Sequence, residues 1–325
     1  MRRLILPVCA AALLLVHATA QDAGLVVGSG NYFSPIVANL ERAVAFYHDG
    51  LGLDVTGTPS TAADNAPLRN MFGLPGAQLR WTVARPVGSR QGVEIVEISQ
   101  AGGRPLDRRV TDQGAMTLVM STSEDLDMVV NRVKDHGGTV ISGPVAQTPT
   151  DARRAIVRDP DDHFVELIAA DRNAAPPSPH IRLTVRDPRT GDFYAKALGL
   201  QSTGSKPTAD LVLLTRTAKI ATISAGATEL RVPNSNLVIE FVTFGSASRR
   251  MSGRIQDPGS TRLQLQVRDL DAAIQAVVRA GGRVVSSGGM PVELPGGRGG
   301  STRAAIVQDP DNLFLVLIQA AAPRG

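Results

Sequence analysis

The stretch VRDPDDHFVELI (157–168) recurs in altered form as VQDPDNLFLVLI (307–318) near the end of the chain. Both copies read as a strand, a tight Asp-Pro-Asp turn and a second strand, because Pro and Asp favour turns and the flanking residues are apolar. Glu166 lies within the second apolar run of the first copy, and Val316 occupies the same place in the second. A carboxylate on a strand that is otherwise apolar on both faces needs water, a cation or a hydrogen-bonding partner. We therefore expect Glu166 to face a polar cavity, for which the second copy has no counterpart.

Two further pairs of similar segments show that the whole chain is repetitive. FSPIVANLERAVAFYHDGLGLDV (33–55) resembles HIRLTVRDPRTGDFYAKALGLQ (180–201), each reading as a strand, a polar break and a helix that ends at Leu-Gly-Leu. LVMSTSEDLDMVVNRVKDHGGTVISGP (118–144) resembles LQLQVRDLDAAIQAVVRAGGRVVSSGG (263–289), each with an Asp that caps a helix and a Gly-Gly that ends it. The chain therefore holds four modules in the order A, B, A′, B′, each strand–helix–strand–strand–strand.

The length and the junction between B and A′ suggest how these modules are grouped. The chain has 325 residues, which exceeds one core of ordinary size and suits two domains. DRNAAPPSP (171–179) has the composition of a linker. We therefore predict two domains of two modules each, at 28–172 and 178–322.

Composition excludes several classes of protein. Hydrophobic residues make up 43% and charged residues 20% of the chain, as in soluble globular proteins. Aromatic residues reach only 4%, with a single Trp, and the Lys and Arg residues are scattered. Nucleic-acid binding needs stacking platforms or a basic patch, so we expect no nucleic-acid partner.

The first twenty residues predict an export segment. Arg2 and Arg3 precede the apolar run LILPVCAAALLLV, which is followed by the small residues Ala18-Thr19-Ala20. The run is shorter than the roughly 20 residues that span a bilayer, and Leu-Pro-Val before Cys9 is a poor signal for lipid attachment. We expect cleavage after Ala20 and a periplasmic or secreted protein that no longer contacts the membrane. Cleavage would lower the formal net charge from +4 to +2 and would remove the one cysteine.

The repeated motifs resemble a known family. A strand followed by L-E-R-A-x-x-F-Y-x-x-x-L-G-L (from Leu40), closed later by D-P-D-x-x-F-x-E-L-I (from Asp159), is similar to the vicinal oxygen chelate superfamily of glyoxalases, bleomycin-resistance proteins and extradiol dioxygenases. The resemblance covers nearly all of the chain after residue 20. It implies an α+β fold in which four βαβββ modules pair into two cup-shaped domains of mixed sheets. In that family the cup holds a metal ion or a small molecule.

The resemblance also implies where metal ligands would lie, on the first and last strand of each module. First-strand ligands would fall on Tyr32, on Leu118 or Thr117, on His180 and on Arg262; last-strand ligands would fall on Glu97, Glu166, Glu240 and Val316. Of the first-strand positions only His180 is an imidazole. For each Glu, a neighbouring Arg or solvent at a sheet edge is an alternative to a metal.

Two pairings of the modules remain open and lead to different sites. If neighbours in the chain pair, neither domain supplies the three protein ligands that a catalytic divalent ion usually needs. If B pairs with A′, then Glu166, His180 and Glu240 converge on a two-carboxylate, one-histidine site for Zn, Ni, Mn or Fe. The metal is therefore a possible cofactor only, and no cofactor is certain.

Three functions follow from these patterns. The leading hypothesis is an exported glyoxalase-like protein, monomer or homodimer, whose cup binds a small organic molecule, with Arg262 neutralising an anionic group and Tyr32 and Trp81 forming walls. Solvated Arg262 and a plain core position for Trp81 are the alternatives. The second hypothesis is a metal-dependent lyase or isomerase of the glyoxalase kind, or an extradiol-type dioxygenase, in which Glu240 and Glu166 are catalytic. The third is a scaffold without a reaction.

Overall fold

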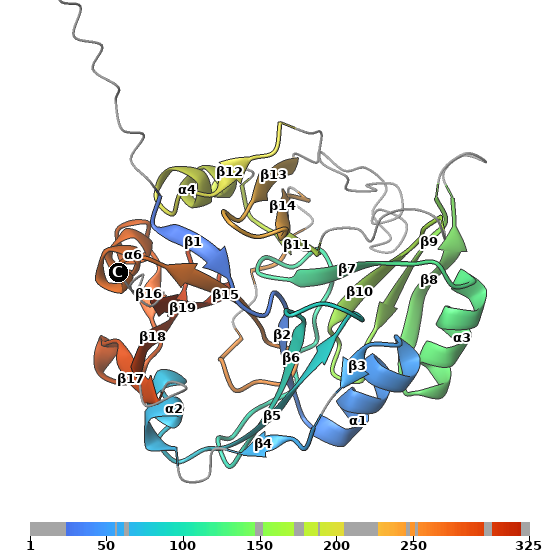
Figure 1. Ribbon diagram of the computed structural model, residues 1–325, viewed down its shortest axis with the longest axis horizontal. Coiled ribbons are helices and arrows are strands. Elements are labelled where there is room, and N and C mark those ends of the chain that lie inside the picture. The colour runs from blue at the N-terminus through green and yellow to red at the C-terminus, as the bar shows by residue number, and fades with distance from the viewer. Residues whose placement is uncertain are drawn as a thin grey trace, which may run out of the picture.

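Two mixed β-sheets form the framework of the protein (Figure 1). The computed structural model describes residues 24–55, 57–61, 65–146, 152–171, 179–187, 189–204, 227–244, 248–250, 253–295 and 301–319. The predicted export segment at 1–20 and most of the linker predicted at 171–179 therefore lie outside the described residues. No helix within the described ranges is long and apolar enough to cross a membrane.

Sheet 1 and sheet 2 are both open and combine parallel with antiparallel neighbours. Sheet 1 has the order β16 (Arg283–Val284), β18 (Ser301–Gln308), β19 (Phe314–Gln319), β15 (Thr261–Val267), β2 (Ser34–Val37), β6 (Val93–Ser99), β5 (Gln78–Arg85), β3 (Asp54–Val55), with β1 (Val26–Ser29) beside β15, β17 (Val292–Pro295) beside β18 and β4 (Ser60–Thr61) beside β5. Sheet 2 has the order β12 (Gln201–Ser202), β13 (Ala227–Arg231), β14 (Val238–Val242), β11 (His180–Thr184), β7 (Met116–Thr122), β10 (Phe164–Ala169), β9 (Arg154–Arg158), β8 (Thr139–Val145). The predicted α+β class with mixed sheets is confirmed.

Each sheet takes one module from each side of the linker. In sheet 1 the first strands of A and B′ run antiparallel, with Ser34 opposite Arg262. In sheet 2 the first strands of B and A′ run antiparallel, with Thr117 opposite Arg182. Of the two pairings open from the sequence, the structure has the second, B with A′. The pairing of chain neighbours within 28–172 and within 178–322 is not adopted. Modules A and B lie in different sheets and contact each other through the main core, and so do modules A′ and B′.

The helices of the four modules pack on the face of each sheet that contributes to the main hydrophobic core. They are α1 (Leu40–Ala45), which continues as the π-turn η1 (Phe46–Gly50), α3 (Leu126–Asp135), α4 (Thr190–Lys196) and α6 (Leu270–Arg279). The two longest begin at the residues that the sequence predicts. The Asp125 carboxylate accepts hydrogen bonds from the first turn of α3, and Asp269 does the same for α6. Both are the Asp N-caps that the sequence predicts. Two further elements, α2 (Ala66–Met71) and the short turn η3 (Ser287–Gly289), lie outside this layer.

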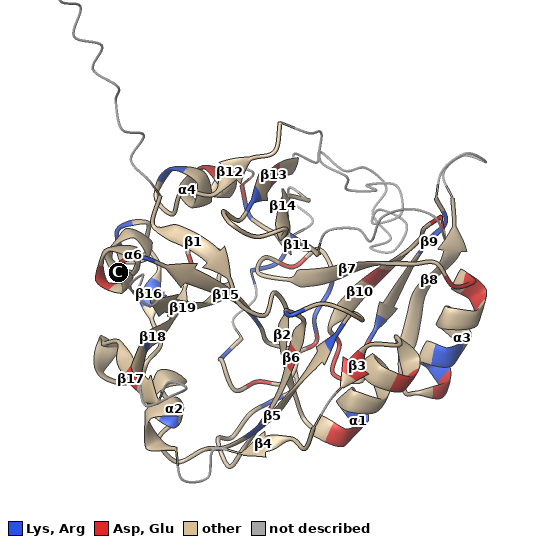
Figure 2. Cartoon of the chain, viewed as in Figure 1, with Lys and Arg blue, Asp and Glu red and all other residues tan. Residues whose placement is uncertain are grey.

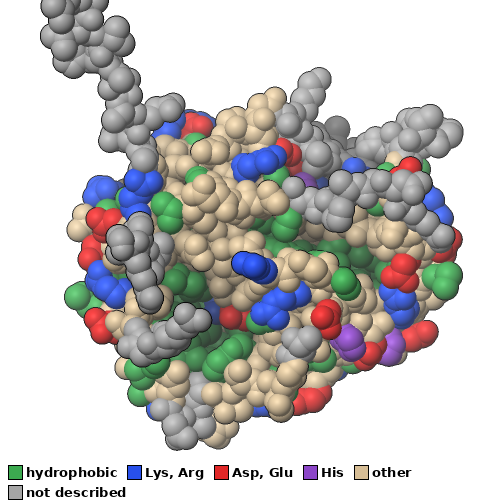
Figure 3. Space-filling view, viewed as in Figure 1, with side chains coloured by type: hydrophobic (Ala, Val, Ile, Leu, Met, Phe, Trp, Pro, Cys, Tyr) green, Lys and Arg blue, Asp and Glu red, His purple; other side chains and the backbone are tan. Residues whose placement is uncertain are grey.

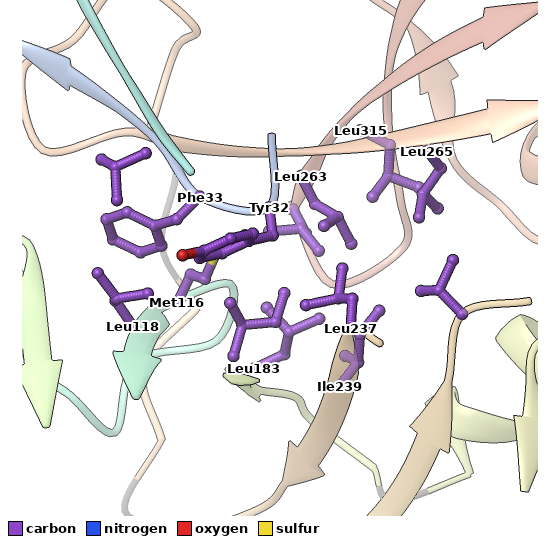
Figure 4. Packing of buried hydrophobic residues seen from close by; sticks show 14 of the residues in the cluster. Tyr32, Phe33, Met116, Leu118, Leu183, Leu237, Ile239, Leu263, Leu265 and Leu315 are labelled. Carbon is purple, nitrogen blue, oxygen red and sulfur yellow. The ribbon is translucent and has the colours of Figure 1, made fainter. Parts of the chain in front are cut away.

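The main hydrophobic core lies on the helix side of the two sheets. Figure 4 shows strand residues from both sheets meeting there, among them Leu118, Leu183 and Leu263. Side chains alternate along a strand, so the other face of each sheet is separate from this core. Two smaller apolar clusters lie on those faces, one lined by Val96 and Val316 in sheet 1 and one around Phe164 in sheet 2. Those two faces carry the candidate sites.

A tyrosine from each Phe-Tyr motif joins neighbouring modules across the main core. Tyr47 donates a hydrogen bond to the Asp159 carboxylate at 3.2 Å, and Tyr194 donates one to Asp309 at 2.7 Å. The same aspartates accept hydrogen bonds from backbone N–H groups within their own Asp-Pro-Asp turns. The repeated Phe-Tyr and Asp-Pro-Asp motifs are therefore parts of one contact, which fixes A against B and A′ against B′.

Candidate functional site

A cavity of about 210 Å³ opens on the free face of sheet 1, between modules A and B′. We call it the A–B′ cavity. Its walls are apolar and its floor is polar; the lining residues are Leu68, Met71, Phe72, Leu79, Trp81, Glu94, Val96, Arg262, Gln264, Leu294, Ala304, Val316 and Ile318. Figure 3 shows hydrophobic side chains gathered in the lower left of the molecule, over α2 and β17. The cavity has the composition of a small-molecule site, with many apolar groups and few polar ones.

The floor of the cavity is organised around the Glu94 carboxylate. Gln264 Nε2 donates to Glu94 Oε2 at 2.6 Å, and Arg262 Nη2 donates to the same oxygen at 3.2 Å. Ser34 lies beside them, with its Oγ 3.5 Å from Glu94 Oε2. The Arg262 guanidinium also lies over the Phe72 ring, with its Cζ 4.7 Å from the ring centre, where a cation–π attraction favours the charge.

Arg262 is a buried cation with an incomplete set of partners. Its side chain is 1% exposed, and its Nε has no hydrogen-bond partner among the described residues. Burial lowers the pKa of Arg262 below its ordinary value, and the charge of Glu94 opposes this only in part. An unmet buried N–H is costly, which favours an acceptor from water or from a ligand at this point.

A second polar centre lies on the free face of sheet 2, between modules B and A′, and we call it the B–A′ centre. Arg182 contacts both Glu166, through Nη1, and Glu240, whose Oε2 accepts from Arg182 Nε at 2.9 Å. Arg154 Nη1 lies 2.8 Å from the other oxygen of Glu166, and His180 Nε2 lies 3.5 Å from Glu240 Oε2. Glu166, His180 and Glu240 therefore converge, as the B-with-A′ pairing predicted, but an arginine lies among them.

Electrostatics in the B–A′ centre are those of a buried ion cluster. The surface helices α1 and α3 carry both acidic and basic residues, most of which are exposed to solvent (Figure 2). In the B–A′ centre, by contrast, the charged side chains of Arg182, Glu166 and Glu240 are each at most 1% exposed. Burial raises the pKa of Glu166, but the attraction of Arg182 and then Arg154 outweighs it and leaves that pKa below its usual value. The same balance, with Arg182 and His180 opposing burial, lowers the pKa of Glu240. Both carboxylates are therefore ionised at neutral pH.

The strand registers show that the two centres are built on equivalent positions. Ser34 lies beside Glu94 in the parallel pair β2–β6, just as Arg182 lies beside Glu240 in β11–β14. In the other two modules Gln264 pairs with Val316, just as Val119 pairs with Glu166. The four positions are thus Ser34, Glu94, Gln264 and Val316 in the A–B′ cavity, and Arg182, Glu240, Val119 and Glu166 in the B–A′ centre.

The residues at these positions do not fit a divalent ion. The A–B′ set offers one carboxylate, and Arg262 already neutralises it. The B–A′ set offers two carboxylates with a guanidinium between them. Among the described residues, no group of three or more His, Cys, Asp or Glu is arranged to hold a metal. Metal ligands must be deprotonated donors that converge on one point, and in both centres an arginine takes up the carboxylates.

The remaining predicted site residues lie in different surroundings. Trp81 and Arg262 both line the A–B′ cavity, and their role in binding stays a prediction. Tyr32 lies in the main core beside Phe33 and Leu118 (Figure 4), where burial raises its pKa to about 12. It does not line the cavity, because it precedes β2 and turns to the helix side.

Glu97, the predicted ligand from module A, lies on the opposite face of β6 from the cavity. Its Oε2 accepts a hydrogen bond from Leu40 N at 2.8 Å, at the start of α1, and Arg80 lies 3.5 Å away. The acid that faces the cavity is Glu94, three residues earlier. Because side chains alternate along a strand, Glu94 shares a face with Val96 and Glu97 does not.

Sequence reasoning missed Ser34, Gln264 and Arg182 for a related reason. Arg182 lies two residues after His180 on β11, and Gln264 lies two residues after Arg262 on β15. Side chains alternate along a strand, so each of these pairs shares one face and the alternation does not distinguish its two members. The only available signal was Arg182 itself, a long cation inside the apolar strand HIRLT (180–184).

The placement of Glu97 gives a testable prediction. Glu97→Ala is expected to lower the free energy of unfolding by about 1 kcal/mol, because α1 loses an acceptor for its first N–H. Urea unfolding followed by circular dichroism measures this loss. Occupancy of the A–B′ cavity should not change. If Glu97→Ala left stability intact and abolished ligand binding, then Glu97 would belong to the binding site after all.

Comparison with known proteins agrees with this fold. Residues 31–167 match the model of the Glyoxalase/Bleomycin resistance protein/Dioxygenase superfamily. Glyoxalase I from Zea mays is similar in structure, with a TM-score of 0.60 and 19% identity over 91% of this chain and 92% of that chain. A putative dioxygenase from Bacillus subtilis subsp. subtilis str. 168 has a TM-score of 0.51 and 13% identity over 93% of this chain and 87% of that chain. No curated protein sequence matches the chain.

These findings identify the class of protein. Residues 31–167 belong to the Glyoxalase/Bleomycin resistance protein/Dioxygenase superfamily, and the structure has the fold of that superfamily over nearly its whole length. The chain as a whole has four modules arranged in two sheets. At this level of identity the solved structures establish the fold alone, so the activity has to be argued from the two centres themselves.

Proposed function

We propose that the protein binds a small, mostly apolar organic molecule in the A–B′ cavity, with a hydrogen-bond acceptor of that molecule at Arg262. The observation that supports this is the cation at the cavity floor, which is buried, lies over an aromatic ring and has an N–H without an acceptor among the described residues. Apolar walls from α2, β5, β17 and β19 would enclose the rest of the ligand. Hydrophobic enclosure supplies affinity, and the floor supplies orientation.

The charge of the floor narrows the ligand class. Arg262 was expected from the sequence to neutralise an anionic group, but Glu94 already lies 3.2 Å from its Nη2. Together the two groups carry no net charge. The floor therefore favours a neutral acceptor, such as a carbonyl or amide oxygen, over a carboxylate, because a second anion would lie near Glu94 without a second cation.

We also propose that the protein acts outside the cytoplasm, after cleavage behind Ala20. The support is the sequence of residues 1–20, a basic start, a short apolar run and small residues before the cleavage point. The mass of the protein recovered from the periplasm or the medium, compared with that of the full chain, tests this. A mature mass that retained residues 1–20 would contradict the proposal.

Trp81 provides a direct test of the cavity, because it is the one tryptophan of the chain and lines the cavity wall. Titration with benzamide, a neutral acceptor on an aromatic body, is expected to change the Trp81 fluorescence, and benzoate is expected to bind more weakly. Arg262→Met should weaken benzamide binding by about 10- to 100-fold, the value of a hydrogen bond from a charged donor. Arg279→Met, which removes an exposed arginine on α6, is the matched control.

A second variant separates loss of the ligand contact from loss of folding. Val316→Phe fills the cavity without touching the charges of the floor, and it should also abolish the fluorescence response. Melting curves followed by circular dichroism show whether each variant is folded. Unchanged benzamide affinity in folded Arg262→Met and Val316→Phe proteins would place binding elsewhere.

A further inference from the structure

Arg182 occupies an unusual position, at the meeting point of the acidic residues on sheet 2. It projects from β11 next to Glu240 on β14, and it reaches Glu166 on β10 across β7. The Arg182 side chain is 1% exposed. Among the described residues its partners are only the two carboxylates, one at Nε and one at Nη1, and its Nη2 has none.

The groups around Arg182 are the kinds of ligand that a divalent cation takes. Two carboxylates and an imidazole approach the guanidinium, since His180 Nε2 lies 3.5 Å from the Glu240 oxygen that Arg182 binds. Glu240 Oε1 and His180 Nε2 have no hydrogen-bond partner among the described residues, although both are buried. Of the two carboxylates Arg154 contacts Glu166, whereas Arg182 bridges both, so this donor set with unmet capacity is organised around Arg182.

The other sheet shows what happens at the same positions without this arginine. Ser34 stands where Arg182 stands, and Val316 stands where Glu166 stands. The second carboxylate and the arginine are therefore present together in one centre and missing together in the other. This matches a balance of charge: Arg182 and Arg154 balance Glu166 and Glu240 in one centre, and Arg262 balances Glu94 in the other.

We propose that Arg182 is the resident cation of the B–A′ centre, in which its guanidinium takes the place of a divalent ion between Glu166 and Glu240. The centre therefore excludes metal in the native protein. It becomes a metal site only when the Arg182 side chain is removed and the two carboxylates and His180 are free to close on an ion. This inference concerns sheet 2 and does not depend on the function of the A–B′ cavity.

Arg182→Ser is the direct test, because serine is the residue that the equivalent position of sheet 1 carries. Co²⁺ serves as the probe, followed by its visible absorption, with Zn²⁺ in competition. Wild-type protein is expected to show no stoichiometric Co²⁺ site, and Arg182→Ser is expected to bind one equivalent at least ten times more tightly. Zn²⁺ should raise the melting temperature of Arg182→Ser and leave that of the wild type unchanged.

Two controls assign the new site to the proposed ligands. Adding Glu166→Val or His180→Ala to Arg182→Ser should remove the Co²⁺ site. Arg182→Lys keeps a cation between the carboxylates, and this variant should not acquire a Co²⁺ site. A folded Arg182→Ser protein that binds Co²⁺ no better than the wild type would overturn the proposal.

Measurements on the wild type keep the proposal falsifiable if Arg182→Ser does not fold. Protein purified without chelator and then dialysed against Zn²⁺ is expected to hold no stoichiometric metal, and EDTA should leave its melting temperature unchanged. One equivalent of a divalent metal that disappears in Glu166→Gln or His180→Ala protein would show that Arg182 does not replace the ion.

Discussion

Replacing Arg182 by methionine is expected to lower the free energy of unfolding by about 3–5 kcal/mol. The substitution keeps much of the side-chain volume but leaves Glu166 and Glu240 buried without their shared cation. Each of these carboxylates is at most 1% exposed, so water cannot replace the lost partner. Urea unfolding at neutral pH in the presence of EDTA measures the loss without interference from metal.

A triple variant separates the net contribution of the ion cluster to the free energy of unfolding from the cost of leaving its carboxylates unpaired. Glu166→Val, Arg182→Met and Glu240→Leu together replace the ion cluster by apolar side chains, and their combined effect should be far smaller than that of Arg182→Met alone. Buried ion clusters often contribute little net stability against a well-packed apolar alternative. Equal losses in the single and the triple variant would mean that packing, and not uncompensated charge, accounts for the loss.

The second large effect concerns pH and the Asp-Pro-Asp turn of module B′. Burial, together with the charge of Asp311, raises the pKa of Asp309 to about 7 against the opposing hydrogen bonds from Tyr194 and the turn. In the unfolded chain an aspartate ionises near pH 4. Between about pH 4 and pH 7 the unfolded state has thus already lost the proton that the folded state keeps. Stability should therefore fall as pH rises through this window, by an amount on the order of 4 kcal/mol, since each unit of pKa difference corresponds to about 1.4 kcal/mol.

Asp309→Asn is expected to remove this fall. The amide oxygen of asparagine can still accept the N–H groups of the turn, and its NH₂ can donate to Tyr194, so the fold is retained while the titration is lost. Unfolding free energies at several pH values from 4 to 8 measure the difference. Asp54→Asn, which neutralises an exposed aspartate, is the control. A wild type and an Asp309→Asn variant with parallel pH profiles would contradict the assignment.

The first Asp-Pro-Asp turn, in module B, differs from the second in one partner of its aspartate. In module B, His163 takes the place of Leu313, and its Nδ1 lies 2.8 Å from Asp159 Oδ2. The other ring nitrogen lies 3.1 Å from the Ser260 carbonyl oxygen. Asp159 therefore has a basic partner that Asp309 lacks.

The sequence predicted the local structure well because local structure depends on nearby residues. The Asp caps at 125 and 269, the paired glycines that end their helices and both Asp-Pro-Asp turns lie where the repeats indicate. These features need only a few consecutive residues with particular backbone preferences. Module pairing is different, since first strands such as β2 and β15 are apolar on their main-core face and present a similar edge to any partner.

The candidate site was predicted in part, and its errors have physical causes. The convergence of Glu166, His180 and Glu240 followed from the B-with-A′ pairing, and Arg262 and Trp81 line a cavity. Glu97 was chosen over Glu94 although only one of the two can face the free side of β6. Arg182 was missed because an arginine next to two acids is not visible until the strands are paired.

The contrast between Glu166 and Val316 has its explanation in these pairings. Glu166 is retained between Arg182 and Arg154, which contact its two oxygens and match its charge. Val316 lies in a cavity whose arginine, Arg262, is matched by Glu94 alone. A second acid there would carry an uncompensated charge.

The crossed arrangement of the modules also means that neither half of the polypeptide contains a complete sheet. While the chain is being synthesised, module A must wait with the edge of β2 uncovered until β15, more than two hundred residues later, leaves the ribosome. Modules B and A′ are consecutive and can join at once. A fragment ending near the linker would keep two open strand edges, which are prone to wrong association. Each half supplies the strands that the other lacks, so both halves together are needed to complete the A–B′ cavity and the B–A′ centre.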